Sequence, residues 1–102
     1  MHNTEKQVEQ LFINANQALN FLRVVLDDLI LRKELFALDS QKKIFQSQQK
    51  YKRNKAALMN IGNIIHSTEY PLPEKLRIHL AKNLRARISA IIDESIELDK
   101  LR

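Results

Sequence analysis

The segment Ser67–Pro73, with the sequence Ser-Thr-Glu-Tyr-Pro-Leu-Pro, contains both prolines of the chain and is its strongest helix-breaking signal. Proline has no backbone N–H to donate, and it restricts the conformation of the residue before it. The rest of the 102-residue chain holds a single glycine and no proline, so little else interrupts a helix. We therefore expect a connection at this segment, with long helices before and after it.

Apolar residues recur at helical spacing on both sides of this connection. They predict helices over residues 4–38, 40–66 and 73–100, with Asp39 or Ser40 able to cap the second of them. Together with a hydrophobic content of 44%, this pattern predicts an all-α fold, an antiparallel bundle of three long helices. A chain of this length fits a single domain over its whole length, residues 1–102.

The first predicted helix carries two apolar stripes. The inner stripe has heptad spacing and consists of Val8, Leu11, Ala15, Ala18, Leu22, Val25 and Leu29. The second stripe runs beside it and consists of Phe21, Val24, Leu31, Leu35 and Leu38. Two adjacent stripes require two covering neighbours. We expect both neighbours to come from the same chain, with the alternative that the second stripe forms a homodimer through residues 4–38 and so builds a larger bundle.

The chain is basic, with a net charge of +5 and a pI near 9.7, which permits an anionic partner. If the chain turns back at its proline-containing connection, residues of the last two helices lie level when their numbers sum to about 139. This level rule places Lys42 and Lys43 beside the acidic end of the last helix, at Glu97. It leaves a belt of basic residues at the middle of the bundle, namely Lys50, Lys52, Arg53, Lys55, Lys82, Arg85 and Arg87. The alternative is that these side chains point in different directions and form an ordinary solvated surface.

Catalysis and metal binding find little support in the sequence. The chain has no cysteine, and therefore no disulfide, thiolate nucleophile or cysteine-based zinc site, and it has no glycine-rich loop to hold a phosphate. His66 and His79 flank the connection, but the level rule separates them by roughly 9 Å along the bundle. Adjacent acids such as Asp27 and Asp28 point about 100° apart on a helix, so they do not converge. We expect a protein that is not an enzyme and uses no metal or cofactor.

The N-terminal residues are polar, so we expect no signal peptide. No apolar run approaches the roughly 18 residues that span a bilayer, so we expect no transmembrane segment. The absence of cysteine also fits the reducing cytoplasm. The expected location is therefore cytoplasmic.

A small bundle with a spare apolar stripe and no catalytic constellation is typical of a binding protein. We expect a macromolecular partner, most simply a protein, bound through the basic belt and an apolar helix face. The predicted partner-binding residues are Lys50, Tyr51, Lys52, Arg53, Lys55, Arg85 and Arg87. A nucleic acid is the alternative partner, because lysine and arginine contact phosphates without reading bases.

Residues 57–80, Ala-Leu-Met-Asn-Ile-Gly-Asn-Ile-Ile-His-Ser-Thr-Glu-Tyr-Pro-Leu-Pro-Glu-Lys-Leu-Arg-Ile-His-Leu, resemble bacteriocin immunity proteins. Those proteins are cytoplasmic helical bundles of similar size, often basic, in which a long helix is followed by a Leu-Pro start of the last helix. Leu72, Pro73 and Leu76 carry the match here. The family usually divides its N-terminal half into two helices, whereas residues 4–38 show no break. The resemblance implies a further alternative, protection of a producer cell by binding a bacteriocin–receptor complex at the membrane.

Overall fold

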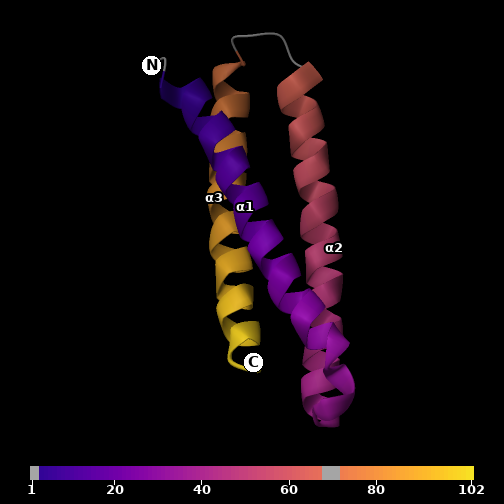
Figure 1. Cartoon of the computed structure of the whole chain (residues 1–102). Helices are drawn as coiled ribbons and strands as arrows, with labels where there is room; N and C mark the ends of the chain where they lie inside the picture. Colours follow the sequence, from indigo (N-terminus) through magenta and orange to yellow (C-terminus); the bar gives the residue numbers. More distant parts are fainter. Residues whose placement is uncertain (1–2, 68–71) are drawn as a thin grey trace.

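The computed structural model of the chain describes residues 3–67 and 72–102. Figure 1 shows α1 (Asn3–Leu31), the 3-10 turn η1 (Lys33–Leu35), α2 (Leu38–Ser67) and α3 (Glu74–Asp99) in chain order. The described part of the chain contains no strand. The predicted all-α bundle of three long helices is therefore confirmed.

Helix α1 is the element that the other two helices share. In Figure 1, α1 runs obliquely across the front of the bundle. The N-terminal part of α1 lies over α3, and the C-terminal part of α1 lies over α2. Helix α1 packs extensively against both helices, whereas the backbones of α2 and α3 approach each other at few places. α1 and α3 run in the same direction and α2 runs opposite to them, which gives an elongated body of 51 × 20 × 17 Å.

The inner stripe of α1 forms the centre of the core, as predicted. The buried apolar residues of α1 are Val8, Ala15, Leu19, Leu22, Val25, Leu26 and Leu29. From α2 they are Ile44, Leu58, Ile61 and Ile65, and from α3 they are Leu80, Ala81, Leu84, Ile91 and Leu98. Leu11 and Ala18 are half-buried against this cluster. Burial of these side chains is the main source of stability for a bundle of this kind.

The turn after α1 differs from the prediction. α1 ends at Leu31, so an unbroken helix over residues 4–38 is wrong at its C-terminal end, and Asp39 lies inside the first turn of α2 rather than capping it. The backbone at Phe36 is extended, with φ −97° and ψ 152°. Phe36 packs half-buried against the core, and Gln41 Nε2 donates a 2.9 Å hydrogen bond to its carbonyl oxygen. Because no glycine or proline marks this turn, tertiary packing sets its position.

The second turn occurs where the prolines predict it. α2 ends at Ser67, and α3 begins after Pro73, whose carbonyl accepts a 3.0 Å hydrogen bond from the Arg77 backbone N–H. Leu72 is buried just before this helix start. Residues 68–71 of the predicted connection lie outside the described residues.

Gly62 allows α1 and α2 to approach closely. A Cβ atom at this position would lie 2.9 Å from Cζ of Phe12, which is closer than a real Cβ contact. The Phe12 ring meets the His66 ring edge-on, with centroids 6.5 Å apart. A glycine inside a helix costs roughly 0.5–1 kcal/mol relative to alanine. The close approach of the Phe12 ring explains why the chain keeps glycine here.

A double-mutant cycle tests this packing. We expect Gly62→Ala to lower the free energy of unfolding in the wild-type chain, because the Phe12 ring has to move. In a Phe12→Leu chain, which lacks Cζ, the same change should raise it by about 0.5–1 kcal/mol through helix propensity. Urea unfolding of the four chains followed by circular dichroism measures the coupling. Equal effects in both backgrounds would show that the ring does not restrict position 62.

Candidate interaction surfaces

The level rule predicted for the last two helices holds in the structure. Three pairs link α2 with α3 at levels close to the predicted sum of about 139. They are Lys43 Nζ with Glu97 Oε2 at 3.6 Å, Lys50 Nζ with Glu94 Oε2 at 3.1 Å, and Arg87 Nη1 with Asn54 Oδ1 at 3.1 Å. The predicted neutralisation of Lys43 by Glu97 is thus confirmed, whereas Lys42 lines a groove of α2 with Leu38 and Phe45.

Three of the predicted partner-binding residues take part in contacts within the bundle, namely Lys50, Tyr51 and Arg87. Lys50 forms the ion pair with Glu94, and Arg87 donates to both Asn54 and Asn83, the latter at 2.8 Å. Tyr51 is half-buried and packs against the core. These side chains join α2 to its neighbours.

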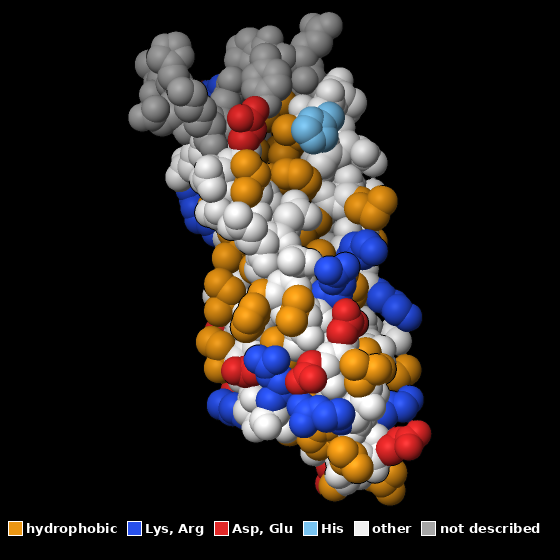
Figure 2. Space-filling model, in the orientation of Figure 1, with side chains coloured by type: hydrophobic (Ala, Val, Ile, Leu, Met, Phe, Trp, Pro, Cys, Tyr) orange, Lys and Arg blue, Asp and Glu red, His pale blue; other side chains and the backbone are white. Residues whose placement is uncertain are grey.

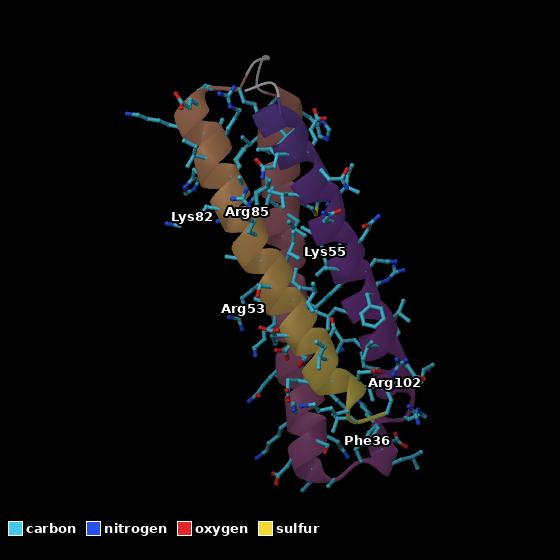
Figure 3. All side chains as sticks on the ribbon, turned by 90° about the vertical axis from the view of Figure 1, so that its left-hand side faces the viewer. Phe36, Arg53, Lys55, Lys82, Arg85 and Arg102 are labelled. Atoms are coloured by element: carbon cyan, nitrogen blue, oxygen red, sulfur yellow. The ribbon has the colours of Figure 1, made fainter. Side chains whose placement is uncertain are left out.

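The other members of the belt lie on different faces. Lys52 and Lys55 line a groove between α1 and α2, whereas Arg85 lines a groove between α1 and α3 that also contains Asp93. In Figure 3, Arg53 and Lys82 project from the left edge of the bundle, whereas Lys55 does not. The structure therefore does not gather the seven belt residues on one surface, and their role in binding stays a prediction.

The α1–α2 groove also contains a basic residue that the sequence patterns did not single out. Arg23 lines this groove together with Tyr51, Lys52 and Lys55, and Asp27 is the one acid among its lining residues. No other basic residue lies near Arg23 in the sequence of α1, so only the packing of α1 on α2 reveals its basic neighbours. These four residues form what we call the basic groove, namely Arg23, Tyr51, Lys52 and Lys55.

Ser47 and Glu94 form a polar contact between α2 and α3 at the edge of the core. Ser47 is fully buried and its hydroxyl donates to Oε1 of Glu94, while Lys50 donates to Oε2. The Glu94 side chain is only 19% exposed. A carboxylate in such a place needs partners for its charge, and the serine and the lysine supply them. This contact helps to keep the polar first half of α2 helical against α3.

Replacing Ser47 by alanine tests this contact. We expect Ser47→Ala to lower the free energy of unfolding by about 1.5–3 kcal/mol, because a hydrogen bond to a largely buried carboxylate is lost. Ser89→Ala on the exposed side of α3 is the matched control and should change it by less than about 0.5 kcal/mol. Equal effects of the two substitutions in urea unfolding would contradict the role of Ser47.

The acidic end of α3 is compensated by nearby cations. Glu97 accepts a hydrogen bond from Lys100 at 2.9 Å and pairs with Lys43, and Asp99 pairs with Arg102 at 2.6 Å. The hydrogen bond and charge of Lys100, followed by the charge of Lys43, lower the pKa of Glu97 below its ordinary value. This compensation offsets the unfavourable position of acids at a helix C-terminus.

The separate effects of Lys100 and Lys43 on the pKa of Glu97 can be measured. Lys100→Met should raise the pKa of Glu97 more than Lys43→Met does, because Lys100 both bonds to the carboxylate and lies closer to it. NMR titration of the Glu97 carboxyl carbon against pH gives the values. Lys42→Met is the control. It should change the pKa of Glu97 less than either substitution, because Glu97 pairs with Lys43 rather than with Lys42. A larger effect from Lys43 than from Lys100 would contradict this assignment.

The second apolar stripe is not covered by the chain. α1 has the two internal neighbours that the sequence predicts, α2 and α3, but the expectation that one of them covers the second stripe is wrong. Leu31, Leu35 and Leu38 are 86%, 81% and 74% exposed, and Phe21 and Val24 are about half exposed. Both α2 and α3 pack on the inner stripe of α1, and neither reaches around to the second one. The leucines lie at the end of the α1–α2 hairpin, which extends beyond the end of α3 in Figure 1.

The middle of α1 presents a surface without charge. No charged residue occurs from Gln10 to Leu22, although 28% of the whole chain is charged. We call the outward residues of this part of α1, together with Val24, the neutral face. Its members are Gln10, Ile13, Asn14, Gln17, Asn20, Phe21 and Val24.

An apolar groove continues the neutral face onto α3. Phe21, Ala18, Ile88, Ile92 and Ile96 are among the residues that line it, and its volume is about 470 Å³. Ile92 and Ile96 are about half exposed. Figure 2, which views the molecule from the side of α1, shows apolar and uncharged polar side chains together across the middle of this side, with charged side chains lower on the body, along both edges and near the upper end.

The described residues contain no group of three or more histidine, aspartate or glutamate residues that could hold a metal ion. None of the described helices is long and apolar enough to cross a membrane.

Comparison with protein-family models, with curated proteins and with solved structures finds no match to this chain. The resemblance of residues 57–80 to bacteriocin immunity proteins therefore depends only on the residues quoted for it and has no support from these comparisons. In the structure, Leu72 is a core residue, Pro73 precedes the first turn of α3 and Leu76 is half-buried.

Proposed function

We propose that this chain is a non-catalytic interaction protein that binds another polypeptide through the neutral face and the adjoining groove on α3. The observation that carries this proposal is a run of half-exposed large apolar side chains that the chain itself leaves uncovered. Monomeric proteins rarely expose large contiguous apolar patches without a function for them. Depletion of charge and the presence of an aromatic residue such as Phe21 are typical of the centre of a protein interface.

The exposed side chains set a scale for the binding energy. Fully burying a large apolar side chain is worth about 1.5–3 kcal/mol, so completing the burial of a half-exposed one contributes roughly 1 kcal/mol. Ile13, Phe21, Val24, Ile92 and Ile96 together then supply on the order of 5 kcal/mol. Association costs at least about 4 kcal/mol in lost freedom of motion. A stable partner must therefore also cover the amide side chains of the neutral face and satisfy their hydrogen bonds.

The basic groove favours a nucleic acid as the second candidate partner. Arg23, Lys52 and Lys55 surround Tyr51 there, which combines phosphate-binding cations with one aromatic ring. Asp27 in the same groove opposes an anion. The immunity-protein alternative belongs to the same class as the main proposal, because those proteins also act by binding other proteins.

Photocrosslinking from the neutral face tests the proposal. With p-benzoylphenylalanine in place of Phe21, we expect a covalent adduct with a polypeptide in the cells that make this protein. Met59, which is exposed and apolar on α2, is the matched control position and should give no such adduct. Gel shift and mass spectrometry identify the adduct. Equal labelling from both positions, or none from position 21, would overturn the proposal.

A titration against generic DNA and RNA tests the nucleic-acid candidate. If the neutral face is the binding surface, fluorescence anisotropy at about 50 and 200 mM salt should show no strong, steeply salt-dependent binding. If the chain does bind, and a variant with both Lys52→Glu and Lys55→Glu does not, the result would favour the nucleic acid as the partner instead. Arg53→Glu with Lys82→Glu is the control, because it makes the same change of charge away from the basic groove.

A further inference from the structure

The neutral face has the chemistry of a surface that binds its own copy. Resting on the proposed function, we infer that the polypeptide on this face is a second copy of the chain, arranged as a two-fold symmetric dimer through α1 and the adjoining edge of α3.

The absence of charge favours a second copy over an unrelated partner. The chain carries a net charge of +5, so two copies repel each other over most orientations. A two-fold interface brings the same patch of both copies together, and a charged patch would then face its own sign. The neutral face has no charged residue from Gln10 to Leu22, so two copies meet there without this repulsion.

The polar residues of the face are also self-complementary. A carboxylate only accepts hydrogen bonds and an ammonium only donates them, whereas an amide side chain does both. Gln10, Asn14, Gln17 and Asn20 are all amides, so each can pair with an amide of the second copy. Gln10 Nε2 already donates to Asn14 Oδ1 at 2.9 Å, which shows the same kind of pairing within one helix.

Charges around the face are of both signs and partly paired. Arg85 and Asp93 line the same groove on its α3 side. At its C-terminal end, Asp28 pairs with Arg32 at 2.9 Å and with Arg102 at 3.8 Å. Glu9, Arg23 and Asp27 also border the face. The border then carries four acids and four basic residues and adds no excess of one charge that would oppose a copy.

From Gln10 to Val24 the neutral face spans about 21 Å at 1.5 Å per residue, on a body that is 51 Å long. Each partner contributes roughly 800 Å² to a stable interface, so the half-exposed isoleucines of α3 form part of the interface as well. The groove between Phe21 and Ile96 supplies a recess for an apolar side chain of the second copy.

Sedimentation equilibrium of the purified chain tests the dimer. We expect a species of twice the 12.0 kDa chain mass that dissociates on dilution. Raising the salt from about 50 to about 200 mM should strengthen it, because screening reduces the repulsion between the two positive copies. Phe21→Glu should raise the dissociation constant at least tenfold. Phe45→Glu, at an exposed apolar position on α2, is the matched control and should leave it unchanged.

Two further substitutions separate self-association from binding of a charged partner. Gln17→Glu and Gln17→Lys should both weaken the dimer, because either charge meets its own copy across the two-fold axis. Circular dichroism checks that all variants stay folded. The inference is overturned if the wild-type chain is monomeric up to millimolar concentration. It is also overturned if Leu35→Glu dissociates the dimer and Phe21→Glu does not. If the chain is monomeric and position 21 crosslinks to a different protein, the inference of a second copy is overturned. The proposed function then still holds.

Discussion

The whole bundle depends on one helix serving two neighbours at once. α2 and α3 approach each other at few places, and the inner stripe of α1 fills the space between them. Leu22 and Leu29 in this stripe are completely buried, which places them at the centre of the shared core. Because that stripe is fully used inside, the opposite side of α1 has to face outward. The neutral face is thus a direct consequence of how the core is built.

Much of this architecture could be predicted from the sequence. The proline-containing connection and the apolar spacing fixed the order and approximate extent of the helices, and the level rule placed Lys43 beside Glu97. The end of α1 could not be predicted, because residues 31–38 contain neither glycine nor proline and have helical spacing. What accompanies the end of the helix is the packing of Phe36 on the core, together with a hydrogen bond from Gln41 to the Phe36 carbonyl.

The basic belt shows the limit of counting along a helix. Level along the axis can be estimated from residue number, but direction around the axis changes by about 100° at each step. Lys52 and Arg53 are neighbours in sequence, yet Lys52 lines the groove with α1 while Arg53 projects from the edge of the bundle. Lys50 and Arg87 are used in contacts between α2 and α3. A similar level therefore did not produce a common surface.

Two separate apolar surfaces remain outside the core, and their surroundings distinguish them. The leucines at the end of the α1–α2 hairpin have Arg32, Lys33 and Glu34 directly among them, so a partner would have to remove those charges from water to cover them. Phe21 lies at a groove that extends onto α3, and the residues that line this groove are amides, a serine and apolar residues. Covering this groove removes apolar surface from water, and no ionic group lines it. For that reason the middle of α1, rather than the more exposed end of the hairpin, is the surface from which we expect binding.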